Sequence, residues 1–222
     1  MDGNRSTGWK KTIWIGIVVF VISFLYAFVR YNIVREVSLE QLPLYITNKA
    51  VAMAATIVIG LSFVLGPLAG FFPSRFSKWT YIRKPLGLLG FGLAFIHAIM
   101  SLILFNPANY SRFYSESGKL TGLIESSMLF GILAFFIFGI MTIIAIPSIE
   151  EKLDKGQWKT ILRLGYLAYI FVLLHVALMG YRGWFNPDAW QYGLASITLI
   201  TAFFIILVLL LRLLAGVFLK KR

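Results

Sequence analysis

The chain of 222 residues has no cysteine, two histidines, and nine acidic residues against 21 lysines and arginines. Without cysteine it cannot exchange disulfides or hold an iron–sulfur cluster or another metal through thiolates. There is also no GxGxxG fingerprint in a strand–helix context, and no loop is long enough for a soluble flavin or nucleotide domain. These absences exclude several redox classes and leave His97 and His175 as the only imidazoles.

Apolar and aromatic residues make up 59% of the chain, and the mean hydropathy is +0.82. Both values are typical of an integral membrane protein. Six continuous apolar segments approach the ~20 residues that a helix needs to cross the hydrocarbon layer, whereas a membrane barrel would show short alternating segments. The sequence therefore predicts an all-α integral membrane protein. Residues 1–222 would form one domain, a bundle of six transmembrane helices at about 12–29, 50–72, 86–105, 126–146, 161–179 and 194–214.

The net charge of +12 would suit a nucleic-acid partner, but the positions of the charges indicate a membrane topology instead. Fifteen of the 21 lysines and arginines group with the two termini, the second connection and the fourth connection, and six group with the other connections. Positive residues favour the cytoplasmic side of a membrane. We therefore predict that both termini are cytoplasmic, that the chain is a multi-pass protein of the cell (inner) membrane, and that it binds no nucleic acid.

Both histidines lie deep inside apolar segments, where an ionisable side chain is costly and suggests a functional site. His97 lies roughly 16 Å along the third helix and His175 roughly 21 Å along the fifth, at about 1.5 Å per residue. These two helices run in the same direction, so the imidazoles are expected at similar depth. Since imidazole is a common axial ligand of haem iron, the pair predicts one bis-histidine haem site. Zinc is a weaker fit, because it usually takes four ligands.

Small residues accompany both histidines. They would leave room for a macrocycle, or they would simply allow close helix packing; they are Gly87, Gly90, Gly92, Ala94, Ala168, Ala177 and Gly180. The alternative reading is a haem-free membrane transporter or assembly protein, in which the histidines form structural hydrogen bonds. A transporter should show inverted repeats and interrupted helices. No clear repeat is present, and Pro67 is the only proline well inside an apolar segment.

Two stretches resemble a known family. Residues 83–89 (RKPLGLL) followed by 94–97 (AFIH) are similar to the third helix of the ferric-reductase-like transmembrane domain, and residues 158–167 (WKTILRLGYL) followed by 174–175 (LH) to its fifth helix. Within that family, the two stretches most resemble the haem-binding subunit of the bacterial periplasmic methionine sulfoxide reductase system. NADPH oxidases, ferric reductases and STEAP metalloreductases are more distant. The resemblance covers about residues 78–181.

The resemblance implies a six-helix b-type cytochrome, the electron-transfer subunit of an oxidoreductase, that passes single electrons across the membrane. Family members often carry a second pair of histidines, but Leu162 and Arg83 occupy those positions here. One haem b, with iron held by His97 and His175, is therefore expected. Electrons would come from a separate donor, a flavin reductase or a quinol, through a flavin or quinone at the cytoplasmic face. An outer-face redox partner, a metal ion or oxygen would accept them.

Two arginines at the outer ends of the helices are candidates for pairing with haem propionates through charge-assisted hydrogen bonds. Arg112 follows the third helix and Arg182 follows the fifth, and each stands among aromatic residues. The same pattern is typical of an interfacial aromatic belt with snorkelling cations. Glu125, which opens the fourth helix, is expected to form an ion pair with Lys49 or Lys119.

Overall fold

The structure is a computed structural model that describes the backbone of residues 2–219. It describes side chains from residue 7 onward, except those of residues 155, 158, 159, 162, 189 and 191. Six helices in this part of the chain are long and apolar enough to cross a membrane, which confirms the predicted number. They are α1 (Asp2–Phe28), α2 (Thr47–Phe71), α4 (Arg83–Leu104), α5 (Gly122–Ile144), α7 (Lys155–Gly180) and α8 (Ile197–Phe218). The short helices α3 (Pro73–Phe76) and α6 (Pro147–Glu150) lie in connections.

Several helices extend beyond the predicted apolar segments. π-helical turns at Val29–Ile33 and Leu42–Ile46 continue α1 and precede α2, so little of the first connection is irregular. α7 begins at Lys155 because Asp154 and Gln157 form a capping box, which satisfies backbone N–H groups at the start of a helix. A hydropathy pattern finds the apolar centre of a helix, whereas caps and polar turns decide where it ends.

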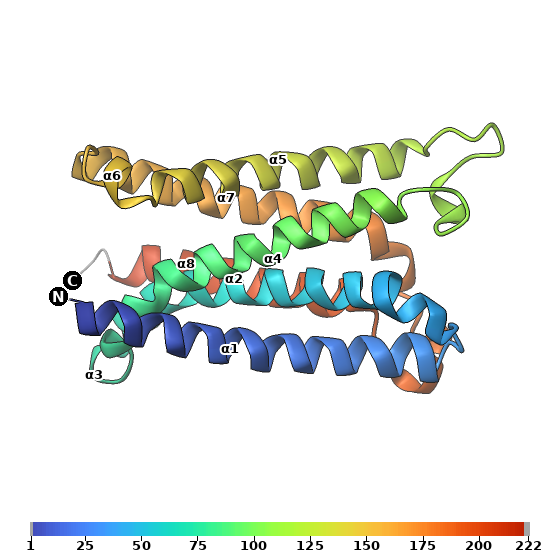
Figure 1. The fold of residues 1–222 in the computed structure, drawn as a ribbon, viewed down its shortest axis with the longest axis horizontal. Helices are drawn as coiled ribbons and strands as arrows, with labels where there is room; N and C mark the ends of the chain where they lie inside the picture. Colours follow the sequence, from blue (N-terminus) through green and yellow to red (C-terminus); the bar gives the residue numbers. More distant parts are fainter. Residues whose placement is uncertain (1, 220–222) are drawn as a thin grey trace.

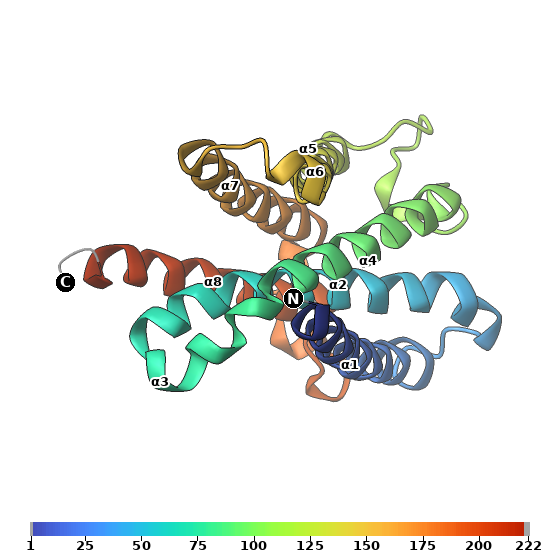
Figure 2. The ribbon, with the colours of Figure 1, turned by 60° about the vertical axis from the view of Figure 1, so that its left-hand side comes forward.

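The two chain ends lie at the same end of the bundle, which we call the terminal end; the opposite end is the distal end (Figure 1). α2 packs against α1, α4 and α8, whereas α5 packs mainly against α7. α8 contacts both α2 and α7 and so joins the two groups of helices. Figure 2 shows the α5–α7 pair on one side of the molecule and α1 on the other. Any group bound between α4 and α7 would therefore lie where these two groups of helices meet.

The core at this junction is aromatic. Phe63 of α2 lies 5.4 Å from the ring of Tyr169 on α7 and 6.4 Å from that of Phe138 on α5. Tyr169 is fully buried, and its hydroxyl donates to the carbonyl oxygen of Thr56 at 2.9 Å. Because a buried phenol usually needs such a partner, this bond fixes α7 against α2 at one depth.

α4 lies close against α2 at Gly90. A Cβ added to Gly90 would lie 2.5 Å from a side-chain carbon of Ile59 and 2.9 Å from its backbone nitrogen. At Gly92, on the same helix, nothing lies within 4 Å of an added Cβ. Gly90 thus serves helix packing, as does Gly180, where an added Cβ would lie 2.0 Å from the Thr198 hydroxyl. The expectation that these two glycines leave room for a macrocycle is wrong.

This difference predicts opposite effects of two matched substitutions. Gly90→Ala should destabilise the chain by about 1–3 kcal/mol, because the new methyl group meets the α2 backbone. Gly92→Ala should be neutral or stabilising by up to about 1 kcal/mol, since alanine favours a helix. Thermal unfolding of both variants in the same detergent measures the difference. Equal effects would contradict the close contact at Gly90.

Candidate functional site

His97 is held from α2. Its Nδ1 lies 2.7 Å from Oδ1 of Asn48, and Nδ2 of Asn48 donates to the hydroxyl of Ser101, one turn beyond His97, at 3.0 Å. Asn48 is buried. With its amide nitrogen directed at Ser101, Asn48 presents its oxygen to His97. The ring therefore carries its proton on Nδ1 and has a free lone pair on Nε2.

His175 is held from α5 in an equivalent way. Its Nδ1 lies 2.8 Å from the carbonyl oxygen of Ser127, and the hydroxyl of Ser127 donates to the carbonyl of His175 at 2.8 Å. A carbonyl can only accept, so His175 also carries its proton on Nδ1. Gly131, one turn further along α5, faces the ring: a Cβ there would lie 2.9 Å from Nδ1. Both histidines thus share one tautomer.

The fold places the two histidines at similar depth on α4 and α7. His97 lies seven residues before the end of α4 and His175 five before the end of α7. At about 1.5 Å per residue, these positions are roughly 10 Å and 8 Å from the distal ends of the helices. Phe135 of α5 packs against Phe91 and Phe95 of α4, at 5.3 and 6.0 Å, and so links the two groups of helices near this depth.

These residues fit a haem iron held from two sides. In the part of the chain that the structure describes, neither Nε2 has a hydrogen-bond partner, while both Nδ1 atoms have one. Metal-ligating histidines typically bind through one nitrogen and donate from the other to a carbonyl or carboxylate, which fixes the ring. No group of three or more His, Cys, Asp or Glu gathers among the described residues, as other metal sites would require.

Arg112 and Arg182 both lie at the distal end and are exposed. The guanidinium of Arg112 stands 5.5 Å from the ring centre of Phe113, and Nε of Arg182 lies 3.5 Å from the hydroxyl of Tyr181. Neither arginine contacts His97 or His175 among the described residues. Their suggested pairing with propionates therefore stays a prediction that depends on a bound ligand.

The expected ion pair of Glu125 with Lys49 or Lys119 is wrong. Glu125 is exposed, and the ion pair found among the described residues joins Lys84 to Glu150. Lys49 instead directs its ammonium group at three aromatic rings, those of Tyr31, Tyr45 and Tyr110, at 5.0, 4.0 and 5.3 Å from the ring centres. We call these four residues the Lys49 cage. Burial raises the pKa of the Tyr110 phenol, so that ring is neutral.

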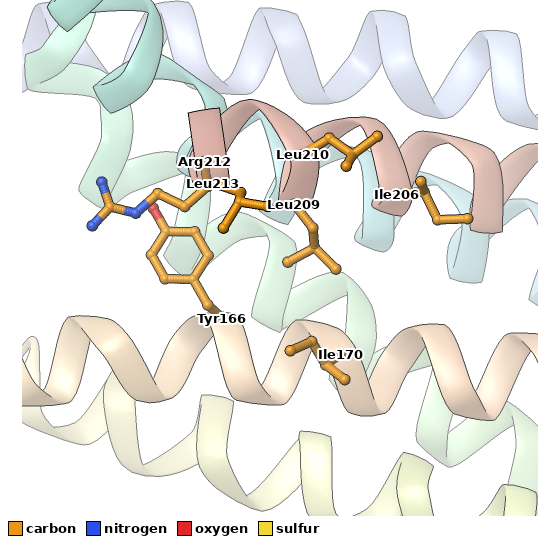
Figure 3. Close-up of a pocket in the computed structure, with 7 residues that line it drawn as sticks. All are labelled: Tyr166, Ile170, Ile206, Leu209, Leu210, Arg212 and Leu213. Atoms are coloured by element: carbon orange, nitrogen blue, oxygen red, sulfur yellow. The ribbon is translucent and has the colours of Figure 1, made fainter. Parts of the chain in front are cut away.

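The terminal half of the bundle has a different chemistry. Arg83, at one of the positions where the family often has histidine, donates from Nε to the carbonyl oxygen of Ser62 at 3.2 Å and so crosses to α2. Leu162, at the other position, has a side chain outside the described residues. An open groove of about 350 Å³ lies between α7 and α8. Figure 3 shows Tyr166 at one end of this groove, beside Arg212, whose guanidinium is 5.0 Å from the tyrosine ring centre.

Together, six apolar helices and a pair of oriented histidines within them define a multi-pass membrane protein with two imidazoles inside its helices. Residues 51–161, half of the chain, match the family described as ferric reductase like transmembrane component. The chain belongs to this family. The matched region contains His97 and ends before His175.

Curated relatives include metalloreductase STEAP2 from Homo sapiens, 27% identical over 219 residues, and STEAP2 from Mus musculus, 27% identical over 217 residues. Each of these matches covers 82% of this chain and 44% of the relative. Metalloreductase STEAP3 from Rattus norvegicus is 24% identical over 221 residues, which cover 84% of this chain and 44% of the relative. The chain thus spans about half the length of the curated relatives that it matches.

Proposed function

We propose that this chain is a b-type cytochrome that passes single electrons across the membrane through one haem bound between His97 and His175. The observation that carries the proposal is the shared tautomer: each ring has an acceptor at Nδ1 and a free lone pair at Nε2. Haem b, when bound, supplies a one-electron iron couple. Membership of the ferric-reductase-like family and similarity to proteins named metalloreductases support the same class of activity.

The chain's own residues would have separable tasks. His97 and His175 would ligate the iron from opposite faces, which leaves no position for a substrate on the metal. Asn48 and the Ser127 carbonyl would keep both rings turned and protonated on Nδ1. The apolar helices around the site would exclude water. At the distal end, Arg112 and Arg182 would pair with the propionates.

The direction of transfer follows from the charges. We place the terminal end, with most of the lysines and arginines, in the cytoplasm, and the distal end outside the cell (inner) membrane. Electrons would enter at the terminal end from a flavin reductase or a quinol. The groove beside Tyr166 and Arg212 would suit the ring system of a flavin or quinone, because it combines apolar walls with one cation. A redox partner, a metal ion or oxygen would accept the electrons at the distal end.

Haem content tests the proposal most directly. The purified chain should carry about one haem b, because it has one pair of histidines, and should show a low-spin spectrum. A pyridine haemochrome assay against protein concentration measures this ratio. Colourless protein from haem-replete cells that also fails to bind added haem would favour a haem-free transporter or assembly protein. A ratio near two would contradict the single site.

The proposed orientation has its own test. A reporter that is active only outside the cytoplasm should be inactive when it is fused after Arg222, and a cytoplasmic reporter at the same place should be active. A fusion after Lys119, in the connection between α4 and α5, should show the opposite pattern. If the two fusions gave the reverse result, the electron path would have to run the other way.

A further inference from the structure

Lys49, the centre of the Lys49 cage, is next in sequence to the residue that holds His97. Lys49 follows Asn48, whose amide oxygen lies 2.7 Å from Nδ1 of His97, and Asn48 also donates to Ser101. The residue that holds the ligand and the residue that carries a charge beside it are therefore neighbours in one turn of α2.

Among the described residues, no carboxylate forms an ion pair with Lys49. The ion pair seen among the described residues is at the terminal end, between Lys84 and Glu150. The partners of Lys49 are aromatic rings, and the Tyr45 ring is the nearest at 4.0 Å. A ring face attracts an ammonium group through its quadrupole, but it leaves the net positive charge in place. The cage would thus stabilise the protonated form of Lys49 without cancelling its field.

We propose that Lys49 is a positioning residue whose caged charge raises the reduction potential of the iron bound by His97. This inference rests on the proposed function. Reduction adds one negative charge at the iron, so a fixed positive charge nearby favours the reduced state. Asn48 acts in the opposite direction, because an acceptor at Nδ1 makes the imidazole a stronger donor and favours the oxidised state. One turn of α2 would thus set the potential through two opposed effects.

The size of the effect follows from Coulomb's law. Two unit charges about 10 Å apart, at an effective dielectric constant of about 20, interact strongly enough to change an equilibrium roughly tenfold. We therefore expect Lys49→Met to lower the ratio of reduced to oxidised haem about tenfold at the wild-type midpoint. For a one-electron couple this is a shift of about 59 mV to lower potential. The low-spin spectrum should be unchanged, since both ligands remain.

The experiment is a spectroelectrochemical titration of the full chain in detergent, with four variants. Lys49→Arg keeps the charge and should titrate within about twofold of the wild type. Lys119→Met removes an exposed charge of the distal connection that is screened by solvent, so it should also stay near the wild type. Asn48→Leu should shift the midpoint to higher potential. If Lys49→Met does not fold, Lys49→Gln takes its place in the series.

Each outcome bears on the inference. An unchanged potential in Lys49→Met would overturn it, as would an equal shift in Lys49→Arg, because packing rather than charge would then be the cause. An equal shift in Lys119→Met would assign the effect to general surface charge and overturn the inference. Loss of haem from Lys49→Met would make Lys49 a binding residue and also overturn the inference. Absence of haem from the wild-type chain would instead refute the proposed function itself.

Discussion

Replacing His97 or His175 by alanine should remove the low-spin haem spectrum of the purified chain. Each imidazole has an acceptor at Nδ1 and a free lone pair at Nε2, so both rings are oriented to ligate iron through Nε2. Removal of a single supporting group typically costs a metal site about 10–100-fold in affinity, and loss of a ligand should cost at least that much. We expect haem content to fall at least about tenfold, or the remaining haem to become high-spin. Absorption and electron paramagnetic resonance spectra distinguish these results.

Two controls separate loss of a ligand from loss of fold. Ile96 is the residue before His97, and the Ile96 side chain is 47% exposed. Ile96→Ala should therefore leave the spectrum as in the wild type. Added imidazole should enter the space left in His97→Ala and restore part of the low-spin signal. If either alanine variant kept a wild-type spectrum without imidazole, bis-histidine ligation would be refuted.

The sequence alone predicted the elements of this fold because its apolar segments are long and separated by charged turns. A helix that crosses hydrocarbon must satisfy its backbone internally, so composition over ~20 residues determines the element. The histidines could be singled out for a related reason, since a buried ionisable group in such a segment is costly. Their similar depth followed from counting residues along helices that run in the same direction.

The groups that orient the histidines could not be predicted, because they depend on which helices are neighbours. Asn48 supports His97 from α2, and the carbonyl of Ser127 supports His175 from α5. A backbone carbonyl has no sequence signal, and a lone asparagine at the end of an apolar segment is indistinguishable from a helix-end residue. The predicted ion pair of Lys49 is wrong for the same reason. A charge-pairing argument favoured Glu125, whereas the fold placed three tyrosines around the ammonium group.

Gly131 is a further residue of the site that sequence reasoning missed, and its substitution gives the second large effect. A Cβ at this position would lie 2.9 Å from Nδ1 and 3.2 Å from Cε1 of His175. Since α5 and α7 are packed along their lengths, the ring rather than the helix is expected to move. Displacement would lengthen the 2.8 Å contact with the Ser127 carbonyl and turn Nε2 away from the iron. Gly131→Ala should therefore lower haem affinity about 10–100-fold, the usual cost of losing a supporting contact.

Gly139→Ala is the matched control for Gly131→Ala. It lies two turns further along α5, and its added Cβ would meet two ring carbons of Phe91 at 3.5 and 3.9 Å, which are ordinary contacts. Alanine is favoured over glycine in a helix by about 1 kcal/mol, so both variants should keep or gain helix stability. Only Gly131→Ala should lose haem in a competition with apomyoglobin or show a mixed-spin spectrum. Equal haem retention in the two variants would mean that His175 does not need its present orientation to ligate. The common tautomer of the two histidines would then result from helix packing and would not indicate that they ligate iron.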